Sequence, residues 1–384
     1  MKKTRKRLLS LVLLFTMILT IFTGCGNSGG DGGDDGEKKD GYKIGVVIWS
    51  TDDATTAPMK RWLDYYGSEL GYTFEYKTGD FDGESQLAAV ENFIAAGVDG
   101  IMICPLVEAS IENIYQACED AQVPYVQMFR GINDEKLAEE MKSKEYFLGW
   151  VHEDDVAAGY HMVELLAEQG AENFAGVYMG PGNQATDDRQ AGMEQAFEEG
   201  IGNKVAEYIL PMGSSDSTLW TQAATNFYNQ YGDGIDAIVS SVGSNGGSDA
   251  LIAVMESTKA GYKLGEFDCP TATMHGFEND YLHVVANGMM ADPLLAFIIL
   301  ANYLEGTPLC ESDEAVCIDA QYMWITSAEE QELYETYVDK EGVYAYSVDE
   351  VKDMLQSNNP DFTAESLQEV ADNWTLDNVV SKNQ

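Results

Sequence analysis

The chain has few basic residues for its length. Its 384 residues include 22 Lys and Arg against 65 Asp and Glu, a formal net charge of −43. Nucleic acid and anionic lipid headgroups are bound through clustered Lys and Arg, so such a surface excludes both as partners. The four histidines show no metal-ligand spacing and no CxxC pair occurs. No metal and no other cofactor is therefore expected.

Signatures of common enzyme classes are also lacking. The sequence contains no P-loop or HExxH motif, and its one GxSxG match, residues 26–30, lies in a Gly-rich stretch and not between a strand and a helix pattern. Carboxylates outside such a motif are too common to indicate a glycosidase. The sequence therefore favours a binding protein over an enzyme.

The basic residues that do occur are concentrated at the N-terminus, where five precede an uncharged apolar run over residues 8–22. This run is short for a membrane span and is typical of a signal peptide. The Gly24-Cys25 pair that follows resembles the lipobox of bacterial lipoproteins, although Phe22 stands in place of the usual Leu. The resemblance implies that residues 1–24 are removed and that Cys25 carries a lipid on the extracytoplasmic face of the cell membrane. The alternative is an ordinary signal peptide with an incidental cysteine.

Residues 25–41 are rich in Gly and Asp and predict a flexible linker. Without residues 1–24 the net charge becomes about −48, so membrane attachment would depend on the lipid alone. Hydrophobic residues make up 45% of the chain and aromatic residues 11%. This composition and length favour a folded body of two domains over an acidic disordered chain.

From residue 42 onward, short apolar strands alternate with amphipathic helices. The pattern predicts strands at 43–49, 72–77, 100–105 and 123–128, then again at 145–151, 174–179, 204–210, 237–241 and 272–275. Such alternation is typical of βαβ units and a parallel sheet, and the restart predicts two α/β lobes with doubly wound sheets. Ligands bind outside the carboxyl ends of such strands, so we expect a cleft between the lobes.

Several segments closely resemble the ribose-type periplasmic sugar-binding proteins, which serve ABC importers. In the first lobe these are Ile44-Gly45-Val46-Val47, Ala96-Gly97-Val98-Asp99-Gly100 and Val123-Pro124; in the second they are Arg189-Gln190-Ala191-Gly192 and Asp236-Ala237-Ile238-Val239. The resemblance implies two lobes joined by three crossovers. Lobe one would comprise 42–133 and about 288–315. Lobe two would comprise about 144–286, with most of the C-terminal extension, 316–384, lying on it.

The same resemblance implies the ligand contacts. The family holds sugar hydroxyls with polar side chains at strand ends and stacks aromatic rings on the sugar. The matching positions here are Arg130, Arg189, Asp53, Glu278, Asn287 and Asn245. Thr55 and Thr56 replace the family's aromatic pair and Phe129 replaces an Asp, so stacking is expected from Trp49, Trp220 or Phe129.

The scarcity of arginine supports part of this assignment. After residue 24 the chain has only Arg61, Arg130 and Arg189, and two of the three fall at expected cleft positions. A guanidinium suits bidentate hydrogen bonding. The alternatives remain an interlobe ion pair for Arg130, surface pairing of Arg189 with Asp187 or Asp188, and a turn or helix cap for Asp53. Trp49 could equally belong to the core.

Two expectations complete the interpretation. Cys310 and Cys317 flank a short acidic stretch and could form a disulfide in an oxidising compartment. The function expected is the capture of a small polar solute, a monosaccharide or related polyol, by a monomer that delivers it to ABC permease subunits. The alternative is a receptor subunit that presents its ligand to a membrane sensor.

Overall fold

The computed structural model describes residues 41–384 except 54, 244–245, 269–272 and 311–313. Two six-stranded sheets organise this body, as the sequence predicts. One has the strand order β11-β5-β4-β3-β1-β2 and the other β12-β10-β9-β8-β6-β7. All strand pairs are parallel except that of β10 with β12. The prediction of two doubly wound α/β lobes is confirmed.

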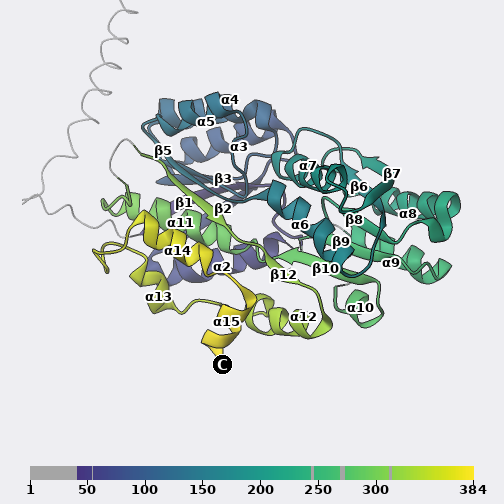
Figure 1. Ribbon diagram of the computed structural model, residues 1–384. Coiled ribbons are helices and arrows are strands. Elements are labelled where there is room, and N and C mark those ends of the chain that lie inside the picture. The colour runs from purple at the N-terminus through teal and green to yellow at the C-terminus, as the bar shows by residue number, and fades with distance from the viewer. Residues whose placement is uncertain (1–40, 54, 244–245, 269–272, 311–313) are drawn as a thin grey trace, which may run out of the picture. The chain divides into compact units, whose positions relative to one another are not determined.

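Lobe one is built around the first sheet. Its strands and helices run in chain order and then return after lobe two: β1 (Tyr42–Ile48), α2 (Thr56–Leu70), β2 (Tyr72–Thr78), α3 (Gly83–Ala96), β3 (Gly100–Ile103), the 3-10 turn η1 (Glu108–Ser110), α4 (Ile111–Ala121), β4 (Tyr125–Met128), α5 (Glu135–Lys142), β5 (Phe147–Glu153), α11 (Ala291–Leu304) and β11 (Val316–Ala320). Helices α3, α4 and α5 lie on one side of this sheet, and α2 and α11 lie on the other (Figure 1).

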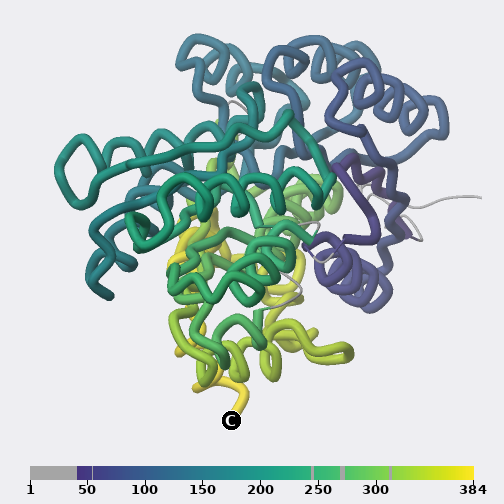
Figure 2. Tube along the Cα trace, turned by 90° about the vertical axis from the view of Figure 1, so that its right-hand side faces the viewer, coloured from purple at the N-terminus to yellow at the C-terminus, as the bar shows by residue number. Residues whose placement is uncertain are grey.

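Lobe two is built around the second sheet. Its elements are α6 (Asp155–Glu168), β6 (Asn173–Met179), α7 (Gln184–Glu198), β7 (Asn203–Leu210), α8 (Ser217–Tyr231), the 3-10 turn η2 (Gly232–Gly234), β8 (Ala237–Ser240), α9 (Gly247–Thr258), β9 (Lys263–Phe267), α10 (Thr273–Glu278), β10 (Leu282–Asn287) and β12 (Met323–Ile325). Figure 2 shows the teal segments of this lobe beside the purple and blue segments of lobe one.

The strands form where the sequence supplies unbroken apolar runs. Ile44 to Ile48 in β1 are all buried, as expected of a parallel strand covered by helices on both faces. Helix α2 ends at Gly71, which has a φ of 84° and donates its backbone N–H to the Gly67 carbonyl. Such left-handed caps favour glycine. Among the described residues, no helix is both long and apolar enough to cross a membrane.

The predicted domain boundaries are wrong at both ends of lobe two. Strand β5 pairs with β4, and β11 pairs with β5, so residues 147–153 and 316–320 belong to lobe one. The first crossover therefore follows Glu153, the second joins β10 to α11, and the third joins β11 to β12. The error arose because an apolar run predicts a strand but does not say which sheet it joins.

A strand in lobe two was also misplaced. Residues 273–278 form α10, whereas Lys263–Phe267 form β9, which lies between β8 and β10. The β9 segment, Lys-Leu-Gly-Glu-Phe, has no continuous apolar run, although Glu266 within it is fully buried. Because of this error, one site residue was predicted at the wrong position in the sequence.

The C-terminal extension lies on both lobes, not mainly on lobe two. It contains α12 (Ala328–Tyr334), a π-helical turn (Glu335–Asp339), α13 (Val348–Asp353), α14 (Ala364–Asp372) and α15 (Leu376–Asn383). Helix α12 packs on α10 of lobe two, whereas α13 packs on α2 and α14 on β11 of lobe one. We call residues 328–384 the C-terminal strap.

The strap also contacts the second crossover between the lobes. The Trp374 indole N–H donates to the Gly288 carbonyl at 2.8 Å, and the Tyr334 hydroxyl donates to Asn287 Oδ1 at 3.0 Å. On lobe one, Arg61 donates to the Asp339 carbonyl at 2.8 Å. The strap is therefore attached to both lobes and to the segment between them.

Candidate functional site

A cavity lies between the lobes at the carboxyl ends of the strands. Four of the residues predicted from sequence line it: Trp49, Arg130, Arg189 and Trp220. The other lining residues are Phe81 from lobe one, Met289 from the second crossover, and Met179, Asn183, Thr186, Gly213, Ser214, Val242 and Asp268 from lobe two. The cavity holds about 50 Å³ of free space, enough for several water molecules.

The lobes are closed over this cavity. The Asn133 amide of lobe one donates to Asp188 of lobe two at 2.7 Å, and the Asn183 amide of lobe two donates to the Leu106 carbonyl of lobe one at 3.4 Å. A ligand in the cavity would therefore be enclosed by both lobes.

Arg130 follows β4 and is 7% exposed. Its Nη1 donates to the Phe129 carbonyl at 2.6 Å, and its guanidinium lies 5.9 Å from the Trp49 ring centroid. Its Nε is buried and has no hydrogen-bond partner among the described residues. A buried N–H without a partner is costly, so this group is available to a ligand.

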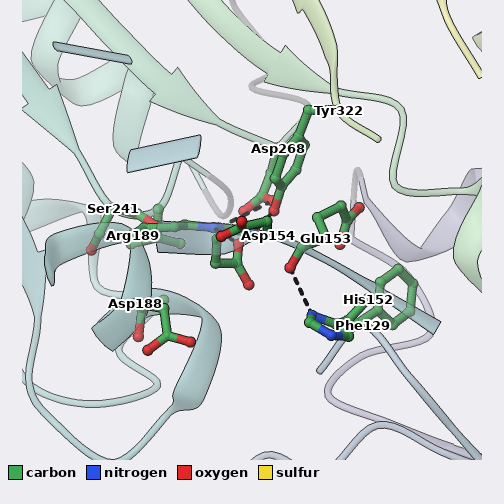
Figure 3. Close-up of polar contacts among 12 residues, drawn as sticks. Phe129, His152, Glu153, Asp154, Asp188, Arg189, Ser241, Asp268 and Tyr322 are labelled. Atoms are coloured by element: carbon green, nitrogen blue, oxygen red, sulfur yellow. Dashed lines mark hydrogen bonds and ion pairs between the residues drawn. The ribbon is translucent and has the colours of Figure 1, made fainter. Parts of the chain in front are cut away.

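Arg189 is 2% exposed and is held by the protein through all three of its nitrogens. Nε donates to Asp155 at 2.8 Å, Nη2 to the Tyr322 hydroxyl at 2.7 Å and Nη1 to the Ser241 carbonyl at 3.2 Å. Figure 3 shows Arg189 and Tyr322 together, with Asp268 beside them. The alternative of surface pairing with Asp187 or Asp188 is wrong.

Close helix packing positions this arginine. Helices α6 and α7 approach so closely at Gly159 that a Cβ there would lie 1.9 Å from the Arg189 carbonyl oxygen. Asp155 opens α6 directly after the first crossover, and Tyr322 lies in the third crossover. Arg189 thus bonds the first residue of α6, just after the first crossover, and Tyr322 of the third crossover, a structural role that sequence reasoning missed.

Asp268 is a site residue that the sequence analysis missed. It follows β9, lines the cavity and is 7% exposed. Its Oδ1 lies 3.6 Å from Arg189 Nη1 and accepts no hydrogen bond from the described residues. Burial raises the pKa of this carboxyl, and the nearby Arg189 and Arg130 oppose that rise. Glu278, predicted instead, is exposed at the end of α10 and does not line the cavity.

The remaining predicted polar contacts lie at the margin of the cavity. Asp53 accepts hydrogen bonds from the Trp49 indole at 2.7 Å and from the Thr56 backbone N–H at 2.8 Å, as the helix-cap alternative expects. Asn287 is 3% exposed and accepts from Tyr334. Neither is among the residues that line the cavity. Asn245 and Cys25 lie outside the described residues.

The aromatic candidates divide in the same way. Trp49 and Trp220 line the cavity, whereas Phe129 packs edge-on against Trp49 with ring centroids 5.3 Å apart. Phe81, which follows β2, lines the cavity and was not predicted.

The expected disulfide is wrong, because Cys310 and Cys317 are both free thiols. Cys317 lies on β11, paired with β5.

Buried acids surround the crossovers beside the cavity. Glu153 ends β5 and Asp292 lies in the first turn of α11, each is 1% exposed, and none of their four carboxyl oxygens has a hydrogen-bond partner among the described residues. Burial and the neighbouring Asp155 raise the pKa of Glu153 to about 7. Burial and Glu153 raise the pKa of Asp292 well above its usual range. One proton held between two such carboxyls removes most of their repulsion.

Comparison with known proteins agrees with this geometry. A family model described as the periplasmic binding protein domain matches residues 44–296. The galactofuranose-binding protein YtfQ of Escherichia coli is 28% identical over 99 residues, 26% of this chain and 29% of that protein. The xylitol-binding protein of Mycolicibacterium smegmatis is 23% identical over 231 residues, 60% of this chain and 62% of that protein. The matches thus span less than two thirds of either relative.

Solved structures share the fold. An ABC transporter solute-binding protein from Bacillus halodurans, with bound myo-inositol, superposes with a TM-score of 0.62 at 21% identity. The superposition covers 78% of this chain and 99% of that one. Nearly all of the other protein is therefore matched, while about a fifth of this chain has no counterpart in it.

Proposed function

The chain belongs to the periplasmic binding protein family, and we propose that it captures one small polyhydroxylated solute, a monosaccharide or polyol, for an ABC importer. One observation carries the proposal. In a closed cavity with two tryptophans, a buried donor, Arg130 Nε, and a buried acceptor, Asp268 Oδ1, both lack hydrogen-bond partners among the described residues. A sugar hydroxyl both donates and accepts, so a polyol satisfies both groups.

The charge of the site favours a neutral solute. Arg130 and Arg189 face Asp268, and Asp155 is paired with Arg189 behind the cavity wall. An anionic ligand would bring a second negative charge beside Asp268, and a cationic ligand would face two guanidinium groups. Either arrangement leaves a buried charge poorly compensated. The apolar faces of a sugar ring also suit Trp49 and Trp220, as in many sites that combine aromatic walls with a few polar groups.

A thermal-shift screen tests this assignment. We expect pentoses, hexoses, xylitol or myo-inositol to raise the melting temperature, because a ligand bound only by the folded state stabilises it. At one hundred times Kd the stabilisation is about 2.7 kcal/mol. Amino acids, carboxylates and sugar phosphates serve as controls. Stabilisation by one of these, with none from any sugar or polyol, would reject the proposed ligand class.

The lipid anchor belongs to the same proposal and rests on Gly24-Cys25 after the apolar run. A lipid on a long Gly-rich tether would keep the binding domain at the membrane near a permease. Cys25→Ala should release the protein from the membrane fraction of its host while its melting temperature stays unchanged. A Cys25→Ala protein that remains in the membrane fraction would refute the anchor alone.

A further inference from the structure

Two loops meet at the edge of the cleft opposite the crossovers. In the strand orders of the two sheets, β2 and β7 are the edge strands farthest from the strands that lead into the crossovers. Phe81 follows β2 and Gly213 follows β7. When two lobes rotate about a hinge, the parts farthest from it separate most. Phe81 and Gly213 therefore lie where opening of the cleft begins.

The contact between these residues is tight and specific. A Cβ placed on Gly213 would lie 2.8 Å from Cγ and 2.9 Å from Cβ of Phe81. Gly213 has a φ of 69°, and its N–H contacts Met179 Sδ at 3.0 Å. Both Phe81 and Gly213 also line the cavity. The phenylalanine ring thus contacts the opposite lobe and the ligand space at once.

The backbone around Phe81 is held in an uncommon conformation. Asp80 has a φ of 48° and Phe81 a φ of 51°, so two consecutive non-glycine residues lie in the left-handed region. Side chains other than glycine adopt this region at an energetic cost, and such residues cluster at ligand clamps. In the closed form the loop therefore turns Phe81 toward the cavity.

We propose that Phe81 is the gate of the binding site. It closes on Gly213 and covers the outer end of a single sugar or polyol, which is the end that faces the β2 and β7 edge of the cleft. The identity of the ligand rests on the proposed function, whereas the gate rests on the contact between the two loops. On that side the Phe81 ring lines the cavity and lies against Gly213 of the opposite lobe. Phe81 should therefore select against solutes that carry a large substituent at their outer end.

A double-mutant cycle tests the gate. Gly213→Ala places a methyl group against the Phe81 ring and should raise Kd for the best-bound screened sugar or polyol at least tenfold. Phe81→Gly removes both the ring and the Cβ that the added methyl group would meet, so adding Gly213→Ala in that background should raise Kd less than threefold. Gly71→Ala is the matched control, because Gly71 has a φ of 84° but no atom within 4 Å of the added Cβ. It reproduces the backbone strain without the clash.

Small-angle X-ray scattering tests the contact between Phe81 and Gly213 without a ligand, because the radius of gyration reports how far the two lobes are open. The radius of gyration of ligand-free Gly213→Ala should exceed that of the wild type, and the double variant with Phe81→Gly should match Phe81→Gly alone. Equal radii for wild type and Gly213→Ala, or equal effects of Gly213→Ala in both backgrounds, would overturn the gate. If no sugar or polyol binds while the radii change as expected, the ligand assignment fails and the gate stands.

Phe81→Ala should also widen specificity. Removal of the ring opens the outer end of the cavity, so a phenyl glycoside of the bound sugar should bind Phe81→Ala at least tenfold more tightly than the wild type. Unchanged binding of the glycoside would show that Phe81 does not limit ligand size.

Discussion

At the residue scale, the two cavity arginines have different partners. Arg130 keeps a buried Nε without a partner among the described residues, whereas all three nitrogens of Arg189 are bonded to Asp155, Tyr322 and Ser241. Arg130 is therefore the better candidate for ligand binding. Arg189 is better placed to hold the crossovers in position beside the cavity.

This difference predicts separable effects of substitution. Arg130→Ala should weaken solute binding about ten- to a hundred-fold, the loss of one charged hydrogen bond of roughly 1.5–3 kcal/mol. Arg130→Lys should restore little, because an ammonium does not reproduce the guanidinium geometry. Arg189→Ala should lower the free energy of unfolding by about 3–5 kcal/mol, because Asp155 is left buried and unpaired. Calorimetric titration and chemical denaturation measure the two effects.

Arg61→Ala is the control for both measurements. Arg61 lies outside the cavity and contacts Asp339 of the C-terminal strap. Its removal should leave affinity unchanged and lower stability modestly. Equal affinity of all three alanine variants for the solute would remove both arginines from the site.

The residues predicted from sequence were those with a local signal. Arg130 and Arg189 were predicted from the resemblance to the sugar-binding family and from the rarity of arginine, and Trp49 from its place at the end of an apolar strand. Asp268 was missed because β9 contains Lys263, Gly265 and the buried Glu266, and so lacks an apolar run. Phe81 was missed because its role depends on a contact with the other lobe, which no local pattern encodes.

At the element scale, strand and helix periodicity predicted most elements but not their assignment to lobes. Strand β5 looks the same whether it begins the second sheet or completes the first, because both positions require a buried apolar strand. The C-terminal strap was likewise assigned to one lobe, although its helices pack on both. Long-range packing decides such questions, and a single sequence carries little information about it.

The strap should stabilise the junction between the lobes. Trp374 is 1% exposed, packs edge-on against Trp62 with centroids 5.8 Å apart, and donates to the Gly288 carbonyl. Trp374→Phe keeps an aromatic ring but leaves that carbonyl without its donor. We expect a loss of about 1–3 kcal/mol in the free energy of unfolding, measured by urea denaturation.

The matched control removes an exposed hydrogen bond. Tyr208→Phe deletes the hydroxyl that donates to Gln222 at 3.3 Å on the surface, and it should change stability by less than about 0.5 kcal/mol. A Trp374→Phe protein as stable as Tyr208→Phe would show that the strap contributes nothing through this contact.

At the scale of the whole molecule, buried acids should make stability depend on pH. In the folded state burial raises the pKa of Glu153 to about 7 and that of Glu266 to about 8, against an ordinary value of 4.5. Above pH 4.5 the unfolded chain loses these protons while the folded chain retains them. These two groups should therefore lower the stability as the pH rises from about 5, by about 1.4 kcal/mol per pH unit for each group, up to pH 7 for Glu153 and pH 8 for Glu266.

Replacing Glu153 isolates its contribution to the pH dependence of stability. Glu153→Gln keeps the size of the side chain but cannot ionise, so the slope of unfolding free energy against pH between 5 and 7 should become shallower by about 1.4 kcal/mol per unit. Glu91→Gln, on the exposed face of α3, should leave the slope unchanged. Identical slopes for wild type and Glu153→Gln would mean that Glu153 is ionised in the folded protein.

The account as a whole depends on a single solute bound between Arg130 and Asp268. Calorimetric titration of the wild type and of Asp268→Ala, with the sugar or polyol that most raises the melting temperature, tests this most directly. The account predicts one molecule bound per chain, with at least tenfold weaker affinity in Asp268→Ala, because a buried charged acceptor is lost. Unchanged affinity in Asp268→Ala, or a wild type that binds no sugar or polyol, would contradict it.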